Sequence, residues 1–221
     1  MDQIPIVEIN NVFLKGHRGT QIFKNLSFKL VPGRSAVIQG SAGSGKSSMV
    51  ELLIGLRRPD SGSVELFGES IGKRGSRGRS LLRRKIGGVG GLFELIASYT
   101  VAENIAFPLI LAGERSKARK ERLLKMLSEF SLIKQASEFP RQLTRVERTL
   151  VQFARASIAN QPLMIIDEPS AGLDSKTYER IHEFLVKASF SGRSMIILTS
   201  ETAAEILPNT DYYQLKTGEL V

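Results

Sequence analysis

The sequence lacks several features that mark particular classes of protein. It has no cysteine among 221 residues, which excludes disulfide bonds and cysteine metal sites. It has no apolar run near the roughly 18 to 20 residues that span a bilayer. Its start, MDQIPIVEI, has neither a basic segment nor a long apolar stretch, so we expect no signal peptide. With 42% hydrophobic and 24% charged residues, the composition is that of an ordinary globular domain.

The charge is strongly positive and unevenly distributed. The formal net charge is +9, and much of it falls in residues 73–85 (KRGSRGRSLLRRK) and 114–122 (ERSKARKER). These stretches fit solvated surface, or contact with nucleic acid or an anionic membrane. Charge alone does not choose among these readings.

The pattern of apolar residues predicts an α/β fold. Short apolar or alternating segments predict strands at 7–14, 22–30, 35–39, 163–167 and 194–199. Apolar residues recur at helical spacing after residue 46, and helices are also predicted over 116–130, 145–158 and 177–188. Residues 92–111 are rich in apolar residues and are predicted to be helical as well. Strand and helix alternate at both ends of the chain, which indicates a mainly parallel sheet with a helical insertion in the middle.

A glycine-rich loop follows the predicted strand at 35–39. The segment GSAGSGKS, residues 40–47, matches G-x-x-x-x-G-K-[ST] completely. Glycines let backbone N–H groups surround a phosphate, Lys46 reaches the β- and γ-phosphates, and the Ser47 hydroxyl is placed to bind Mg²⁺. We therefore predict nucleotide binding by Gly40, Ser41, Ala42, Gly43, Ser44, Gly45, Lys46, Ser47 and Ser48.

Two carboxylates end the second apolar strand. Asp167 closes the run LMIID and is placed to hold Mg²⁺, directly or through water. Glu168 follows, in the position of a base that orients or deprotonates the attacking water. Because an acidic pair at the end of a buried strand costs desolvation, we predict a catalytic role for Glu168 and a metal role for Asp167.

These motifs together resemble the ABC-type ATPases, the nucleotide-binding subunits of ATP-driven membrane transporters. The resemblance rests on GSAGSGKS, the helical insertion and DEPSAGLD, and runs from about Val7 to Glu219. RRKIG (83–87) and TVAENIAFPLILAG (100–113) look most like the branch of lipoprotein release, macrolide export and FtsE-type division complexes. The resemblance implies a P-loop NTPase fold in one domain, residues 1–221, with an antiparallel N-terminal β portion. The core of this domain would comprise residues 1–90 and 158–221, and a helical subdomain would comprise about 91–157.

The family also implies partners. Two subunits sandwich two ATP molecules with Mg²⁺, in a homodimer or in a heterodimer with another ABC ATPase, and Asp174 would lie at the subunit boundary. A transmembrane permease-like subunit would dock around residues 88–107, with this chain peripheral on the cytoplasmic face of the membrane. The alternative for residues 88–107 is simple core packing.

The signature segment of the family is altered here. Leu-Ser-Gly-Gly-Gln aligns with Leu143, Thr144, Arg145, Val146 and Glu147. Glycines there would let backbone N–H groups approach the γ-phosphate across the dimer. Arg145 and Val146 add side chains, and Glu147 brings negative charge towards an anion. Thr144 keeps one hydroxyl that can donate, and Arg145 offers a positive charge.

Three further family positions are altered. The glutamine that senses Mg²⁺ and water falls on Gly91, the histidine that contacts the γ-phosphate falls on Ser200, and the aromatic residue that stacks on adenine falls near Gly16. His17 is a substitute for the stacking residue or an exposed loop histidine, and His182 is too distant in sequence to replace the lost histidine. Losing one positioned group commonly costs about two to three orders of magnitude in rate.

Three hypotheses follow. The first is an ABC-type ATP-binding subunit with weak or partner-dependent hydrolysis. The second is a nucleotide-gated regulatory or scaffold module without catalysis, against which the retained Glu168 argues. The third is a nucleic-acid-associated ABC protein, which rests on charge alone, and we expect no nucleic-acid partner because tandem domains and long insertions are missing.

Overall fold

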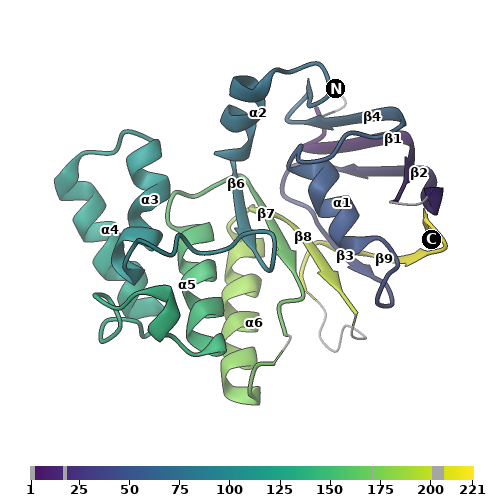
Figure 1. Cartoon of the computed structure of the whole chain (residues 1–221). Coiled ribbons are helices and arrows are strands. Elements are labelled where there is room, and N and C mark those ends of the chain that lie inside the picture. The colour runs from purple at the N-terminus through teal and green to yellow at the C-terminus, as the bar shows by residue number, and fades with distance from the viewer. Residues whose placement is uncertain (1–2, 17–18, 171, 201–206) are drawn as a thin grey trace.

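The fold is built on two β-sheets and a group of helices, shown in Figure 1. The computed structural model describes residues 3–16, 19–170, 172–200 and 207–221. Within these ranges the strands form one sheet of six and one sheet of four. Nearly all predicted elements are present, which confirms an α/β fold with a mainly parallel core, an antiparallel N-terminal β portion and a helical insertion.

The larger sheet is parallel apart from one edge strand. Its order is β10 (Glu219–Leu220), β9 (Thr210–Lys216), β3 (Ser35–Gln39), β8 (Ser194–Thr199), β7 (Leu163–Asp167) and β6 (Ile86–Val89). Only β10 pairs antiparallel, with β9. The carboxyl ends of β3, β8 and β7 therefore lie side by side at one edge, where ligands bind in open parallel sheets.

The smaller sheet is antiparallel and covers one end of the molecule. It consists of β2 (Gln21–Leu30), β1 (Val7–Lys15), β4 (Ser61–Leu66) and β5 (Glu69–Ser70). On β2, the predicted alternation places Leu26, Phe28 and Leu30 in the core, and Phe23, three residues before Leu26, is buried as well. Phe28 also packs edge-on against Tyr213 of β9, with ring centroids 5.5 Å apart, so the two sheets share one apolar core.

Seven helical segments complete the described structure. They are α1 (Lys46–Leu53), α2 (Ser76–Arg83), α3 (Val101–Leu111), α4 (Ser116–Glu129), the 3-10 turn η2 (Pro140–Gln142), α5 (Arg145–Ser157) and α6 (Ser175–Phe190). Figure 1 shows α3, α4, α5 and α6 gathered on one side of the parallel sheet, while α1 lies on the other side, near the smaller sheet. Successive side chains of β7 pack on opposite faces of the sheet, since Ile165 belongs to the core with α1 and Ile166 to the core with α5.

Two parts of the chain differ from the sequence-based expectation. Residues 92–100 are turns, and α3 begins only at Val101, because Thr100 and Glu103 cap it reciprocally. The buried Asn104 side chain holds the preceding turns by accepting from the Ile96 N–H at 2.8 Å and donating to the Tyr99 carbonyl at 3.1 Å. The basic stretch 73–85, read only as charged surface, contains α2 and leads into the core strand β6.

Candidate nucleotide site

The glycine-rich loop joins β3 to α1 at the carboxyl edge of the sheet. Gly43 and Gly45 adopt left-handed φ angles of 81° and 109°. A Cβ on Gly45 would lie 2.9 Å from the Phe23 ring, so only glycine fits between the loop and β2. The loop residues Ser41, Ala42 and Gly43 remain exposed. Their backbone is thus open to a ligand, as a phosphate-binding loop requires.

Lys46 is the first residue of α1 and is only 8% exposed. Its Nζ donates to the Gly40 carbonyl at 2.7 Å and the Ser41 carbonyl at 3.2 Å. The same Nζ lies 3.3 Å from Oε1 of Glu168. One buried cation therefore links the loop to the acidic pair across the site.

The acidic pair lies at the end of β7. Burial raises the pKa of Asp167 first, the neighbouring Glu168 raises it further, and Lys46 opposes both. Glu168 adopts a left-handed φ of 54°, which is uncommon for a residue with a side chain. Its N–H donates to the Leu198 carbonyl of β8 at 2.8 Å, which fixes this turn against the neighbouring strand.

The loop and the acidic pair line one cavity of about 340 Å³. Ser47 and Asp167 both face this cavity, together with Lys46 and Glu168. A hydroxyl and a carboxylate are the hard oxygen ligands that Mg²⁺ prefers, with water completing its shell. A divalent cation here would also relieve the raised pKa of Asp167, so the residues fit the predicted metal.

Ser200 directly follows β8 and contacts Glu168. Its N–H and its hydroxyl each donate to Oε2 of Glu168 at 3.0 Å. Sequence reasoning treated Ser200 only as a lost histidine. The structure adds a contact, because Ser200 holds one carboxylate oxygen while Lys46 holds the other.

The segment that the resemblance aligns with the family's signature forms the beginning of α5. Thr144 is the N-cap: its hydroxyl accepts from the Glu147 N–H at 3.2 Å and donates to Oε2 of Glu147 at 2.9 Å. The Thr144 N–H donates to the same oxygen at 2.8 Å, and Gln135 donates to the other. These hydrogen bonds, those from Thr144 foremost, lower the pKa of Glu147. The Thr144 hydroxyl and the Glu147 N–H are thus already paired within the chain.

The two remaining signature side chains lie in different surroundings. Arg145 is exposed, and its guanidinium lies against Gly172 in the loop after β7. A Cβ on Gly172 would be 3.0 Å from Nη1 of Arg145. Val146 is half-buried and packs against the helical core. Arg145 therefore covers backbone that a glycine at its position would leave open.

Gly91 lies in an exposed loop after β6, and no atom lies within 4 Å of where its Cβ would be. The loop is fixed instead by two residues of α5 that sequence reasoning missed. Gln152 accepts from the Gly90 N–H at 3.1 Å and donates to the Phe93 carbonyl at 3.2 Å, while Arg155 donates to the Glu94 carbonyl at 2.8 Å. Burial lowers the pKa of Arg155 to about 10. The one sequence feature that could have pointed to this contact is the pair Gln152 and Arg155, two polar residues three apart within an otherwise apolar stretch of the helix.

The last predicted positions lie at the edges of the site. Gly16 directly follows β1, and its N–H donates to the Thr20 carbonyl at 2.7 Å, while His17 lies outside the described residues. Asp174 is the N-cap of α6, accepting from the Thr177 N–H at 3.0 Å and its hydroxyl at 2.8 Å, which lowers the pKa of Asp174. Its capping role is a structural use that the sequence did not reveal. His182 lies on α6, stacked near Tyr178.

Comparison with known proteins identifies the family. Residues 23–171 match the family model described as ABC transporter. An uncharacterized ABC transporter ATP-binding protein of Thermotoga maritima is 34% identical over 88% of this chain and 83% of its own length. The lipoprotein-releasing system ATP-binding protein LolD of Pseudomonas syringae is 31% identical over 94% and 92%, respectively.

Solved structures agree. A dimeric bacterial ABC transporter cassette superposes with a TM-score of 0.88 at 29% identity, over 97% of this chain and 96% of that one. A dimeric post-hydrolysis state of an ATP-binding cassette, bound to ADP and phosphate, gives a TM-score of 0.87 at the same identity and coverage. The LolD match lies in the branch that the sequence resembles. The chain therefore belongs to the ABC transporter family of ATP-binding proteins.

Proposed function

We propose that this chain binds MgATP at the loop of residues 40–48 and hydrolyses it slowly, or only when partnered, as the ATP-binding subunit of a membrane transport complex. The observation that carries the proposal is the single cavity shared by Lys46, Ser47, Asp167 and Glu168. Phosphate contacts, a metal ligand and a base are thereby gathered around one point, as phosphoryl transfer requires.

The roles follow from the contacts. The loop backbone and Lys46 bind the β- and γ-phosphates, and Ser47 and Asp167 hold Mg²⁺, which neutralises charge on the phosphates when bound. Lys46 then turns from Glu168 to the nucleotide, which releases Oε1 of Glu168. Ser200 keeps Oε2 in place. Glu168 is left with one oxygen able to accept a proton from water, the task of a general base.

We expect slow turnover because this chain lacks groups that other family members supply. Gly91 brings no side chain to the metal and the attacking water, and Ser200 is too short to reach a phosphate while it holds Glu168. The α5 N-terminus is capped by Glu147, whose carboxylate weakens its attraction for an anion. Each loss removes a positioned group from the transition state, so we expect a rate well below that of an intact site.

A groove beside the Gly91 loop is the proposed contact with the transmembrane subunit. It measures about 490 Å³ and is lined by Phe93, Phe107, Pro108 and Leu111 on one side and by Arg83 to Lys85 on the other. Ile110, Leu111 and Leu92 are exposed nearby, at 48%, 39% and 36%. Exposed apolar residues around a groove are typical of a protein interface. Residues 88–107 thus supply surface as well as core.

The assembly follows from this role. The relatives include dimeric cassettes, and we propose that this chain dimerises on MgATP, with itself or with another ABC ATPase, with Asp174 near the boundary. Among the described residues, none of the helices is both long enough and apolar enough to cross a bilayer. We therefore propose that the chain sits on the cytoplasmic face of a membrane by holding to its permease-like partner.

Phosphate release by the purified chain tests this function, with MgATP binding measured on the same sample. We expect tight binding and slow release, both lost in Lys46→Ala. Rapid turnover that depends on Lys46 would contradict the proposed impairment. Binding with release at the Lys46→Ala background, even after permease is added, would favour the non-hydrolytic module instead.

A further inference from the structure

The basic segment around α2 has no part in the nucleotide site. Residues 73–85 contain seven basic residues and no acidic one. Glu69 is the acidic partner within reach, and it pairs with Arg74 and, at 4.0 Å, with Lys85. The segment therefore keeps a large excess of positive charge at the surface.

Two of these seven basic residues, Lys73 and Arg79, line a cavity smaller than the two described above. It measures about 210 Å³ and lies between the end of α1, strand β4 and the start of α2. Four basic side chains line it, and none of its lining residues is acidic. They are Arg57, Arg58, Lys73 and Arg79. Leu52, Val64 and Ile71 line it as well, so the charges stand around a partly apolar pocket.

Two of the four cations are held in place before any ligand arrives. Arg57 donates to the Lys15 carbonyl at 2.6 Å and lies 3.5 Å from Glu51. Arg79 donates to the Arg74 carbonyl at 2.5 Å, and its stem lies 3.0 Å from where a Cβ on Gly55 would be. Arg58 and Lys73 are exposed, and neither forms an ion pair within the described ranges. The cavity thus combines a fixed basic wall with two cations that can close over an anion.

Two exposed leucines lie close in sequence to residues that line the cavity. Leu56, directly before Arg57, is 61% exposed, and Leu81 on α2 is 50% exposed. Arg77 and Leu81 lie at i and i+4 and so share one face of α2. Leucine between cations suits the boundary between lipid headgroups and acyl chains, whereas a nucleic-acid backbone offers leucine nothing to pack against.

We propose that this cavity binds the phosphate of an anionic phospholipid headgroup, while Leu56 and Leu81 enter the membrane interface beside it. The inference rests on the proposed function in one respect: association with a membrane complex brings the chain to a bilayer. The lipid contact would orient the chain on the membrane independently of the permease groove. It would also give the positively charged segment a ligand of opposite charge.

Vesicle flotation tests the proposal with the full chain and no nucleotide. We expect binding to vesicles of phosphatidylcholine with phosphatidylglycerol, weak binding to phosphatidylcholine alone, and loss of binding as salt rises. Each basic residue near an anionic surface contributes about five-fold to binding. The double variant Arg58→Ala/Lys73→Ala should therefore bind about 25-fold more weakly, while MgATP binding stays unchanged.

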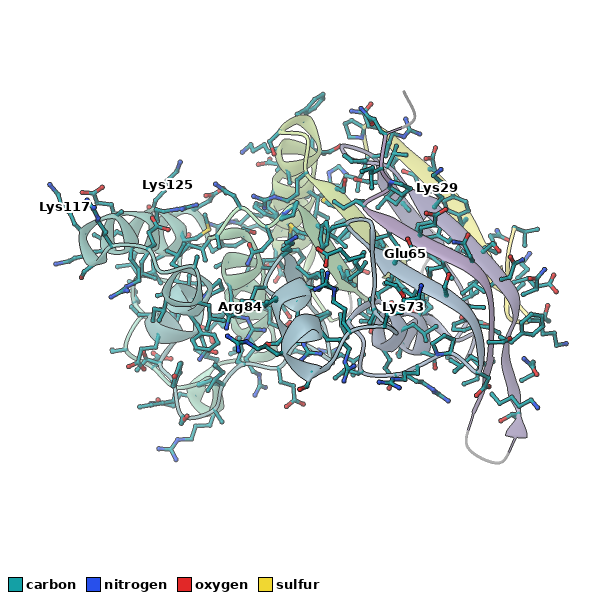
Figure 2. The ribbon with its side chains drawn as sticks, turned by 90° about the horizontal axis from the view of Figure 1, so that it is seen from above. Lys29, Glu65, Lys73, Arg84, Lys117 and Lys125 are labelled. Atoms are coloured by element: carbon teal, nitrogen blue, oxygen red, sulfur yellow. The ribbon has the colours of Figure 1, made fainter. Side chains whose placement is uncertain are left out.

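The matched control is Lys117→Ala/Lys125→Ala, which removes the same charge from α4. Figure 2 shows Lys117 and Lys125 well apart from Lys73. We expect this control to bind vesicles within two-fold of the unchanged chain. An equal loss in both double variants would mean that only net charge matters, and would overturn the site.

Two further arms separate the lipid from other anions. Leu56→Ser/Leu81→Ser should weaken vesicle binding but leave competition by soluble glycerol phosphate unchanged. If phosphatidylglycerol gives no gain over phosphatidylcholine, or if a DNA duplex binds with the same dependence on Arg58 and Lys73, the lipid site is wrong. None of these outcomes affects MgATP binding, so the proposed function is tested separately.

Discussion

Ser200 donates two hydrogen bonds, from its N–H and its hydroxyl, to the same carboxylate oxygen of Glu168, each at 3.0 Å. In this structure Ser200 therefore contacts Glu168, the base of the proposed function. Because Lys46 holds the other oxygen, the position of Glu168 depends on both neighbours.

Ser200→Ala should lower the rate of hydrolysis with little change in the affinity for MgATP. A hydrogen bond to a charged group contributes about 1.5 to 3 kcal/mol, which corresponds to roughly ten-fold or more in rate. Single-turnover hydrolysis and nucleotide titration on the same protein separate the two effects. Ser137→Ala, an exposed serine away from the site, serves as the control. An unchanged rate in Ser200→Ala would show that the contact has no role in hydrolysis.

Gln152→Ala should loosen the loop that contains Gly91. The change removes the acceptor of the Gly90 N–H and a donor to the Phe93 carbonyl, and leaves polar backbone without partners. We expect a loss of about 1 to 3 kcal/mol in the free energy of unfolding. Hydrogen exchange should rise at Gly90. Arg148→Ala, exposed on the same helix, should change neither quantity.

The Thr144–Glu147 cap should stabilise the protein by an amount that depends on pH. The pKa of Glu147 is lowered by the hydrogen bonds from Thr144, so the stabilisation is complete above its ordinary value of 4.5 and disappears as pH falls through the lower folded value. Thr144→Ala should cost about 1 kcal/mol at neutral pH and less in acid. Denaturant unfolding at several pH values measures this. A cost that is constant with pH would contradict the ionised cap.

Asp167→Asn should stabilise the chain without nucleotide and impair binding of MgATP. Burial and Glu168 raise the pKa of Asp167, so the charged form is unfavourable in the folded state. For a raised pKa, the favourable contribution is full below the unfolded value of 3.8 and is lost as pH rises through the folded value. Thermal unfolding near neutral pH should give a higher Tm for Asp167→Asn. A lower Tm would mean that the carboxylate is needed for folding.

Local patterns predicted the elements that carry the site. Residues that are neighbours in the sequence define the strand–loop–helix unit around Lys46 and the strand that ends at Asp167. Both elements could therefore be predicted from the sequence. The contact of Gln152 with Gly90 joins residues that are 62 positions apart, and no local pattern encodes it.

At two places the structure differs from what the sequence indicated. Glu147 was expected to extend towards an anion, whereas it turns back to Thr144, because a Glu three residues after a Thr caps its own helix. The basic residues of 73–85 obscured α2, whose apolar contribution to the core is essentially Leu82. An eight-residue helix that buries one side chain has no repeat of buried apolar positions by which the sequence could identify it.

The ion pair between Lys46 and Glu168 means that the phosphate position already holds an anion of the protein's own. An arriving γ-phosphate has to displace this carboxylate from Lys46, so ligands with little charge gain little by entering. In the absence of nucleotide, Glu168 thus supplies the negative charge next to Lys46. Under the proposed function, the same exchange would free Glu168 from the lysine only when nucleotide is present, so that occupancy of the loop and readiness of the base would be a single event.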